Sequence, residues 1–448
     1  MSIAPARTCA FDILLQVEQK DAYASELLHS PKYLALSRED HALATQIVLG
    51  VLRWRSQLDS ALASASSRPL PKLDAEVRTA LRMGAYQLVH LERVPSHAAV
   101  HESVELVKRA RKTSAAGLVN ALLRKVPRGV RSEPQRELNA SAQDLARQYA
   151  HPEWLVVRWV ERFGVKSAEA ICSADQHVPV TAIRLREASG GAELTAEDSL
   201  NADVRLGDGA LLASARRVES GDITKSKPFT QGRVVIQDEA SQLVALLVGE
   251  GSRILDCCAA PGGKTMLIAE RNTSAAIVAM DIHPHRARLL RERVKAANVH
   301  VVASDLLFSP FRGTFDRVLL DAPCSGTGTL AHHPEIKWRL RPEHIAELQA
   351  LQVRLMRAAM DRVASGGTLL YSTCSLEREE NEGVVDLALV GNSDFVVKPL
   401  DEVLLQLKNQ NLLTVERIES LTSGPYLRTL PGTHPCDGFF AALLEKAP

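Results

Sequence analysis

The chain has 448 residues, of which 46% are hydrophobic and 24% are charged, and its formal net charge is +1. At roughly 150 residues per domain, this length predicts two or three domains, each able to bury a core. The near-neutral balance excludes an argument for nucleic-acid binding from total charge, so any basic surface has to be local. No apolar run approaches the roughly 18 residues of a membrane span, and the N-terminus lacks the apolar core of a signal peptide. We therefore expect a cytoplasmic protein without a membrane segment.

Residues 1–145 are predicted to be all helical. Ala10, Ile13, Leu14 and Val17 recur at helical spacing, and similar apolar patterns follow near residues 47 and 104. Glycine and proline are sparse within these segments. The sequence therefore predicts an all-α N-terminal domain over residues 1–145.

A basic segment ends this helical region. Between Leu106 and Ser132 there are eight Lys or Arg residues and no Asp or Glu. A solvated helix face is the ordinary explanation of such a run, whereas a face that follows RNA phosphates is favoured if an RNA-modifying site exists elsewhere in the chain. The candidate RNA-binding residues here are Lys108, Arg109, Arg111, Lys112, Arg124 and Lys125.

A small α/β connector is predicted over residues 146–230. A polar, Pro- and Gly-containing stretch from Pro127 to Ala142 reads as the linker that precedes it. The sequence HPEWLVVRWVERFG from His151 predicts a short amphipathic helix, 180–186 a strand, and 190–209 a loop. Residues 211–219 then predict another strand, and 232–247 predict a strand followed by a helix that leads into a third domain.

The stretch RILDCCAAPGGKT at 253–265 predicts a strand, a Gly-rich loop and a helix start. Such a loop can cradle an anionic or polar ligand, because its backbone N–H groups and the helix N-terminus provide positive charge. The letters fit neither the P-loop, whose first glycine would fall on Cys258, nor the dinucleotide fingerprint G-x-G-x-x-G. Two interpretations therefore stay open: a nucleotide site at the end of the first strand of an open α/β sheet, and a tight turn without a ligand.

Four apolar runs end in a carboxylate. They end at Asp256, Asp281, Asp305 and Asp321. Strands that are buried on both faces read as continuous apolar runs, and their carboxyl ends line the crevice in which α/β proteins bind ligands. The sequence therefore predicts a doubly wound core over residues 231–448, with a nucleotide site at this edge.

Two cysteines follow strands at the same edge, Cys324 in DAPCSG and Cys374 in YSTCS. A thiolate is a strong nucleophile if nearby positive charge, a helix N-terminus or hydrogen bonds lower its pKa. A lone cysteine is more often a small buried apolar residue. No C-x-x-C pair is present, so we expect neither a zinc site nor another metal site.

Four long stretches, in this order, resemble the motifs of the RNA 5-methylcytosine methyltransferases: DCCAAPGGKT, DAPCSGTGTLAHHPEIKW, YSTCSLEREENE and RTLPGTHPCDGFFAALL. The resemblance implies a Rossmann-like class I methyltransferase domain that uses S-adenosylmethionine. Residues 1–145 resemble, more diffusely, the NusB-type RNA-binding domain, and in relatives the connector is RRM-like. The implied cofactor residues are Cys258, Ala259, Ala260, Pro261, Gly262, Gly263, Lys264, Asp281, Asp305 and Asp321.

The resemblance also assigns roles to the two cysteines. Cytosine carbon 5 is a poor nucleophile until a group adds at carbon 6, and Cys374 is implied to be that nucleophile. Cys324 is implied to assist removal of the carbon 5 proton and product release. Asp321 is implied to hydrogen-bond ring nitrogen 3, and Lys264 to reach Asp321.

The implied substrate is a cytosine of 16S rRNA, cytosine 967 by resemblance, and no obligate protein partner is expected for a monomer. The same chemistry on a tRNA or another rRNA cytosine stays open, as does an idle RNA-binding or assembly factor. Trp338 and Arg339, with Arg341, are expected either to stack on the flipped RNA or to pack on the protein surface.

Three expectations concern the C-terminal part of the chain. Residues 377–381 (EREEN) are predicted to begin a helix, and the last apolar run to form an antiparallel strand that closes the sheet. Cys436 is predicted to be structural.

Overall fold

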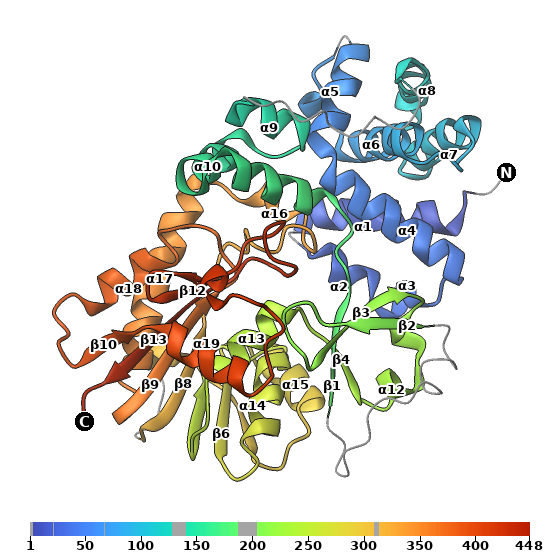
Figure 1. Ribbon diagram of the computed structural model, residues 1–448. Coiled ribbons are helices and arrows are strands. Elements are labelled where there is room, and N and C mark those ends of the chain that lie inside the picture. The colour runs from blue at the N-terminus through green and yellow to red at the C-terminus, as the bar shows by residue number, and fades with distance from the viewer. Residues whose placement is uncertain (1–2, 21, 67, 128–139, 187–203, 309–312) are drawn as a thin grey trace. The chain divides into compact units, whose positions relative to one another are not determined.

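The computed structural model describes residues 3–448 except 21, 67, 128–139, 187–203 and 309–312, and it divides into two compact units. The first unit comprises Met1–Val178 and Leu330–Leu340, and the second comprises Pro179–Thr329 and Arg341–Pro448. Figure 1 traces both units. Most of the predicted linker at 127–142 and of the predicted loop at 190–209 lies outside the described residues.

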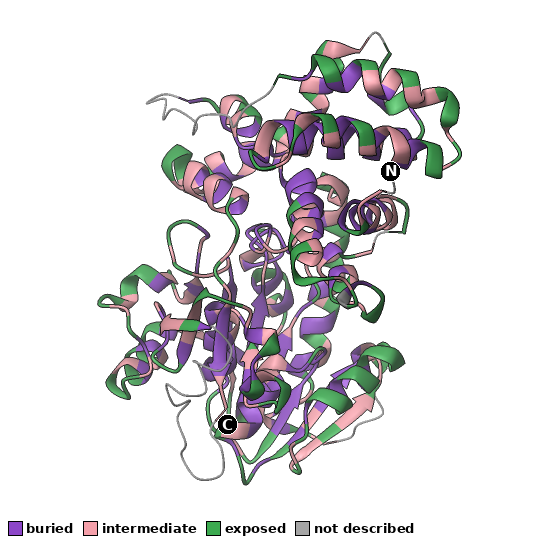
Figure 2. Cartoon of the chain, turned by 90° about the vertical axis from the view of Figure 1, so that its right-hand side faces the viewer, coloured by how far each residue is buried: buried purple, intermediate pink, exposed green. Residues whose placement is uncertain are grey.

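The first unit is helical, as the sequence predicted. Its elements are α1 (Pro5–Lys20), α2 (Ala24–Leu28), α3 (Pro31–Leu34), α4 (Arg38–Arg53), α5 (Arg55–Ala65), η1 (Leu70–Lys72), α6 (Ala75–His90), α7 (Ser96–Arg109), η2 (Thr113–Ala115), α8 (Ala116–Lys125), α9 (Ala142–Gln148), α10 (Glu153–Gln176) and α16 (Ile336–Arg339). Side chains cap some of these helices, as where Ser37 accepts from the backbone N–H of Asp40 at the start of α4. Apolar side chains at helical spacing, Ile13 and Val17 among them, form one core. Figure 2 shows how buried and exposed residues alternate along these helices.

Helix α10 is longer than predicted. The expected short helix was to end near Gly164, and this residue does leave the helical region, with φ 79°. The helix nevertheless resumes beyond it, because Ala168, Ile171 and Cys172 are buried. Both α9 and α10 belong to the helical unit, whereas the sequence placed residues 146–176 in the connector.

The second unit begins with a small antiparallel sheet in the strand order β2-β3-β1-β4. Its elements are β1 (Ala182–Leu185), β2 (Arg205–Asp208), β3 (Ala215–Ser220), η3 (Ile223–Lys225), α12 (Lys227–Thr230) and β4 (Val234–Ile236). Ile183, Val204, Ile223 and Val234 form its core. The strands predicted at 180–186, at 211–219 and at the start of 232–247 are confirmed.

A nine-stranded sheet forms the rest of this unit, in the order β11-β12-β13-β9-β8-β5-β6-β7 with β10 beside β13. Its elements are α13 (Glu239–Leu247), β5 (Arg253–Asp256), α14 (Gly263–Arg271), β6 (Ala276–Asp281), α15 (Pro284–Arg293), β7 (Val299–Ala303), η4 (Leu306–Phe308), β8 (Phe315–Asp321), α17 (Pro342–Met360), β9 (Val363–Thr373), α18 (Glu382–Leu389), β10 (Phe395–Lys398), α19 (Leu400–Asn409), η5 (Ile418–Leu421), β11 (Thr422–Ser423), β12 (Tyr426–Arg428) and β13 (Phe440–Lys446). Strands β7, β6, β5, β8 and β9 are parallel, and β13 runs antiparallel to β9. The predicted closing strand is thereby confirmed.

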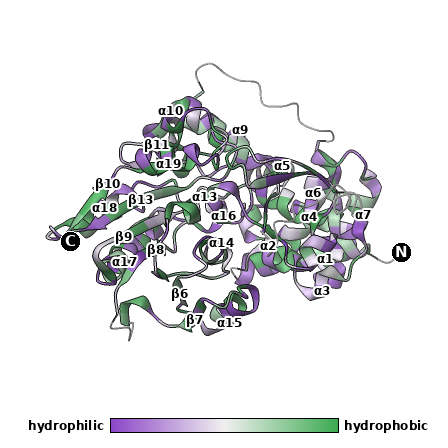
Figure 3. Ribbon diagram, turned by 60° about the horizontal axis from the view of Figure 1, so that its bottom comes forward, coloured by the Kyte–Doolittle hydropathy of each residue, from purple (hydrophilic) through white to green (hydrophobic). Residues whose placement is uncertain are grey.

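Helices cover both faces of this sheet. Successive residues of each central strand alternate between two cores: Ile254 and Leu319 pack with α13 and α14, whereas Leu255 and Leu320 pack with α17 and α18. Strands buried on both faces are apolar throughout, and Figure 3 colours the central strands accordingly. This is the doubly wound architecture that the sequence predicted. In the part of the chain that the structure describes, no helix is long and apolar enough to cross a membrane.

Candidate active site

The Gly-rich loop joins β5 to α14 at the carboxyl edge of the parallel strands. Gly262 has φ 105°, and a Cβ atom there would lie 2.7 Å from Leu290 and 2.6 Å from Val294. Glycine alone adopts this positive φ readily and has no Cβ atom to clash, so the turn requires glycine at this position. Helix α14 begins at the next residue, and the partial positive charge of its N-terminus therefore lies at this edge of the sheet. All of the predicted loop residues, 258–264, lie here.

A buried carboxylate stands at the base of this loop. Asp256 Oδ2 accepts a hydrogen bond from Thr265 Oγ1 at 2.7 Å, while its Oδ1 is buried with no partner among the described residues. Burial raises the pKa of Asp256 to about 7, although the Thr265 hydroxyl opposes this rise. An unpaired buried oxygen is costly, so its presence is a sign that a bound ligand supplies a donor.

The next two strands bring further carboxylates to the same edge. Asp281 ends β6 and accepts from the backbone N–H of His283 at 3.0 Å, while Arg286 Nε lies 3.7 Å from its other oxygen. Arg286 also donates to the carbonyl of Ala260 at 2.9 Å and so ties this strand end to the Gly-rich loop. Asp305, after β7, accepts from the backbone N–H of Leu307 at 2.9 Å. Short turns thus fix both carboxylates.

Asp321, at the end of β8, is held from two sides. Lys264 Nζ donates to Oδ2 at 2.8 Å, and Ser372 Oγ donates to Oδ1 at 2.8 Å. Burial alone would lower the pKa of Lys264, but the Asp321 carboxylate outweighs it, and the pKa is raised. Lys264 Nζ also lies 5.0 Å from the ring centroid of Phe439. A charged lysine therefore stands next to Asp321, as the resemblance implied.

The two candidate cysteines meet in space. The Sγ atoms of Cys324 and Cys374 are 3.3 Å apart, although the residues follow different strands, β8 and β9. The hydrogen bond to Cys374, together with burial, raises the pKa of Cys324 well above its usual range. Cys374 interacts electrostatically with Lys264 and contributes to the raised pKa of that lysine.

The prediction of a helix start at residues 377–381 is wrong, and it left Glu380 unidentified as a residue near the site. Residues 377–381 lie outside the helix, and α18 begins only at Glu382. They form a turn that directs Glu380 inward, where it is fully buried and accepts hydrogen bonds from Ser325, Ser375 and Gln352. A run of acids before an apolar helix was indistinguishable from an acidic first turn. The repeated dipeptide Cys-Ser, at 324 and 374, was the available signal.

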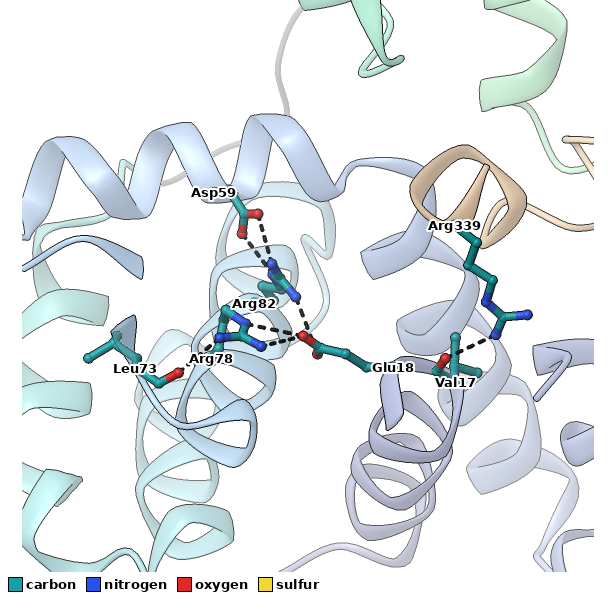
Figure 4. A network of polar contacts seen from close by, with 7 residues as sticks. All are labelled: Val17, Glu18, Asp59, Leu73, Arg78, Arg82 and Arg339. Carbon is teal, nitrogen blue, oxygen red and sulfur yellow. Dashed lines mark hydrogen bonds and ion pairs between the residues drawn. The ribbon is translucent and has the colours of Figure 1, made fainter. Parts of the chain in front are cut away.

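Trp338 and Arg339, two of the predicted RNA-binding residues, form hydrogen bonds within the helical unit. Trp338 Nε1 donates to the carbonyl of Leu52 at 2.6 Å, and Arg339 donates to the carbonyls of Val17 and Ala22. Figure 4 shows Arg339 reaching α1. These contacts support the packing alternative, because the polar atoms that an RNA base would contact are engaged with backbone.

The predicted basic face is partly neutralised. Lys108 pairs with Glu105 at 2.7 Å, and Lys112 pairs with Asp74 at 2.9 Å. Arg109 pairs with Asp12 through two hydrogen bonds, of 2.8 and 3.1 Å. Exposed cations on the same segment are Arg111, Arg124 and Lys125. Arg128 and Arg131 lie outside the described residues.

Comparison with known proteins extends these observations to the whole chain. The family model described as 16S rRNA methyltransferase RsmB/F matches residues 243–445, and the NusB family model matches residues 4–128. The probable ribosomal RNA small subunit methyltransferase B of Bacillus subtilis is 32% identical over 457 residues and covers 100% of both chains. The ribosomal RNA small subunit methyltransferase B of Vibrio vulnificus is 32% identical and covers 98% of this chain and 99% of its own.

Solved structures agree on the fold. The crystal structure of PH0851 superposes with a TM-score of 0.81 at 24% identity and covers 100% of both chains, which is a likeness of fold alone. A methyltransferase homolog from Pyrococcus horikoshii superposes with a TM-score of 0.55 at 27% identity and covers 69% of this chain and 100% of its own.

Proposed function

Because the chain belongs to the RsmB/F family of 16S rRNA methyltransferases and is an S-adenosylmethionine-dependent rRNA methyltransferase, we propose that it methylates carbon 5 of a cytosine through a covalent bond to Cys374. The observation that carries this proposal is the pair of sulfur atoms 3.3 Å apart beside the Lys264–Asp321 ion pair. Addition at carbon 6 and proton removal at carbon 5 occur on adjacent ring atoms. Two neighbouring sulfur atoms suit these two steps.

The residues at the strand ends fit the cofactor. S-Adenosylmethionine, when bound, supplies the electrophilic methyl group that carbon 5 takes up. We assign the ribose hydroxyls to Asp281, because a carboxylate at the end of the second strand is the usual acceptor for them in nucleotide-binding folds. Asp305 follows the third strand and offers a further acceptor, and the unpartnered oxygen of Asp256 offers one beside the Gly-rich loop. The glycines allow close approach of the ligand to the backbone.

The attack step uses Cys374, Lys264 and Asp321. The Cys374 thiolate adds to carbon 6, the 5,6 double bond opens, and its electron pair is delocalised toward nitrogen 3. Lys264 favours the thiolate through its positive charge. A proton passes from Lys264 through the Asp321 carboxyl to nitrogen 3 and neutralises the charge that develops there, so that carbon 5 becomes nucleophilic.

The release step uses Cys324. Bond formation at Cys374 consumes that thiolate, and with it the largest cause of the raised Cys324 pKa. Cys324 then gives its proton to solvent, and the resulting thiolate accepts the proton from carbon 5. The electron pair of the broken C–H bond re-forms the 5,6 double bond and expels Cys374 as a thiolate, while the proton on nitrogen 3 returns through Asp321 to Lys264. The enzyme is thereby freed, with 5-methylcytosine as the product.

Substitution of each cysteine tests this proposal, because the two halves of the reaction give opposite outcomes. Cys374→Ala should bind RNA and cofactor, yet give neither methylated RNA nor a detergent-resistant protein–RNA complex. Cys324→Ala should attack and methylate but accumulate the covalent complex as a shifted band. If the Cys374 variant gives the trapped band instead, the roles of the two cysteines are reversed.

The substrate that we propose is 16S rRNA at cytosine 967, bound by a cytoplasmic monomer. Mapping 5-methylcytosine in ribosomal and transfer RNA from cells that lack the gene identifies the target directly. Loss of the mark from a tRNA or from another rRNA position would support the alternative substrate. An unchanged map, together with the absence of cofactor binding by calorimetry, would support an idle RNA-binding or assembly factor.

A further inference from the structure

The two active-site cysteines are each followed by a serine, and the serines meet as the cysteines do. Ser325 Oγ lies 3.0 Å from Ser375 Oγ, just as the sulfur atoms of the preceding cysteines lie 3.3 Å apart. Both serines are buried. Two Cys-Ser dipeptides from loops fifty residues apart in the chain are therefore paired residue for residue.

A single buried carboxylate joins the two serines. Glu380 Oε1 accepts from the backbone N–H of Ser325 at 2.8 Å and from Gln352 Nε2 at 3.0 Å. Its Oε2 accepts from the hydroxyls of both Ser325 and Ser375. Four donors thus fill the two carboxylate oxygens, which is close to the full capacity of the group. Burial raises the pKa of Glu380, and these hydrogen bonds oppose that rise.

Neighbouring side chains hold this carboxylate in place. Gln352, on α17, also donates to the carbonyl of Pro323 at 2.8 Å, directly before Cys324. The Tyr371 hydroxyl donates to the backbone carbonyl of Glu380 at 2.6 Å. Glu380 is therefore fixed both to the helix and to the strand that leads to Cys374.

We propose that Glu380 is a positioning residue that sets the spacing of Cys324 and Cys374 by holding the serine next to each. This inference rests on the proposed two-cysteine reaction and adds to it a residue that touches neither substrate nor cofactor. During release, Cys324 has to reach the carbon 5 proton while Cys374 is bonded to the adjacent carbon 6. Loosening the two dipeptides should thus impair release before it impairs attack.

Other bonds join the same loops, so removal of Glu380 should loosen the cysteines without separating the loops. The backbone N–H of Gly328 donates to the carbonyl of Cys374 at 2.9 Å, and that of Leu376 donates to Thr327 Oγ1 at 2.8 Å. These bonds are independent of the carboxylate. The folded structure around the site should consequently survive substitution.

Two substitutions of Glu380 distinguish loss of its charge from loss of its hydrogen bonds. In Glu380→Gln, the amide oxygen can accept from Ser325 N–H and Gln352, and the amide nitrogen can donate to the two hydroxyls, which turn to accept. We expect kcat within about threefold of wild type. In Glu380→Ala we expect kcat to fall at least about tenfold and the covalent RNA complex to accumulate, with cofactor affinity within about twofold. Asp386→Ala, which removes an exposed carboxylate of α18, is the matched control.

A second readout reports the spacing without any methylation. The oxidant diamide takes one hydrogen from each of two thiols and joins them as a disulfide, and peptide mass spectrometry identifies the Cys324–Cys374 pair. We expect this pairing to be at least about fivefold slower in Glu380→Ala, and slower in Ser325→Ala and Ser375→Ala, which each remove a single hydroxyl.

The outcomes are distinct. Unchanged kcat and pairing rate in a folded Glu380→Ala overturn the proposal, and so does a Glu380→Gln variant as impaired as Glu380→Ala. If Glu380→Ala fails to fold, unchanged pairing in both serine variants overturns it. If the wild-type enzyme does not methylate cytosine but pairing still depends on Glu380 and both serines, the proposed function fails and the positioning role is supported.

Discussion

Two lysines that are largely shielded from solvent, one in each unit, show how the partner of a charge determines its pKa. Lys264 lies in the second unit with its side chain 14% exposed, and its ammonium donates to the Asp321 carboxylate. Lys337 lies in the helical unit at 1% exposure, and its ammonium donates to two neutral carbonyls, those of Arg53 and Ala150, both at 3.0 Å. The pKa of Lys264 is raised, whereas burial lowers that of Lys337 to about 7.

The difference teaches that burial alone does not mark a functional lysine. A carboxylate compensates the cost of desolvation and keeps the charge, while carbonyl dipoles compensate less of it. Other buried titratable groups surround Lys337: burial raises the pKa of Asp175 to about 8 and lowers that of His151, which lies 3.1 Å from Asp175. We therefore assign Lys264 a role in the reaction. Lys337 has a structural role, because its hydrogen bonds hold residues 330–340 within the helical unit.

The largest expected effect is on the catalytic lysine. Lys264→Met should lower kcat roughly 100-fold or more, because a charge that stabilises developing negative charge typically contributes about 3 kcal/mol. Single-turnover methylation measures it, and cofactor affinity should stay within a fewfold. An equal loss of activity in Lys337→Met, with unchanged unfolding, would remove the distinction between the two lysines.

The carboxylate that we assign to the cofactor should give the next largest effect. Asp281→Ala should weaken binding of S-adenosylmethionine by about 1.5 to 3 kcal/mol, through loss of a charge-assisted hydrogen bond. Calorimetry measures the affinity, with Asp386→Ala as the surface control. Unchanged affinity would take Asp281 out of the cofactor site.

The pH dependence of stability should identify the lysine that loses its charge. Between the folded pKa of about 7 and an unfolded pKa near 10, the unfolded chain binds the Lys337 proton and the folded chain does not, so stability rises with pH. The free energy of unfolding of wild type relative to Lys337→Met should thus increase from pH 8 to 10, by at most about 1 kcal/mol per unit.

Urea unfolding at several pH values measures this difference, and Lys166→Met, which replaces an exposed lysine of α10, is the control. Asp175 contributes in the opposite sense, because its raised pKa makes stability fall as pH rises toward about 8, and this is why the window starts there. A difference that does not change with pH would show that Lys337 stays charged like Lys264.

The smallest expected effect concerns the surface cations, whose contribution to RNA binding should depend on whether an acidic partner neutralises them. Reversing Arg111, Arg124 and Lys125 together should lower the salt slope of RNA binding by up to about 0.9 for each phosphate that these side chains neutralise. Reversing Lys108, Arg109 and Lys112 should lower it less, because Glu105, Asp12 and Asp74 already neutralise those cations. Filter binding at several salt concentrations compares the two sets. Equal decreases in the two sets would mean that the acidic partners do not matter, and a slope unaltered from wild type in both would mean that this face is a solvated surface.

Local patterns were sufficient for much of the molecule. The four carboxylate-terminated runs became β5, β6, β7 and β8, with Asp305 just beyond β7, because a buried parallel strand has to be apolar throughout and its first polar residue marks the edge of the sheet. The same logic placed Cys324 and Cys374 at that edge. Their resemblance to known motifs then supplied the roles that we propose.

Only the tertiary structure decided what depends on partners distant in the chain. EREEN reads as the start of a helix until Ser325 and Gln352 are found around Glu380. For Trp338 and Arg339 the sequence left RNA contact and packing open, and the carbonyls of Leu52 and Val17, which accept their hydrogen bonds, support packing. The continuation of α10 beyond Gly164 likewise became clear only in the structure, where Ile171 is buried. Periodicity reports which face of an element is apolar, but a polar side chain takes its function from the donor or acceptor that folding brings to it, and sequence spacing does not specify that partner.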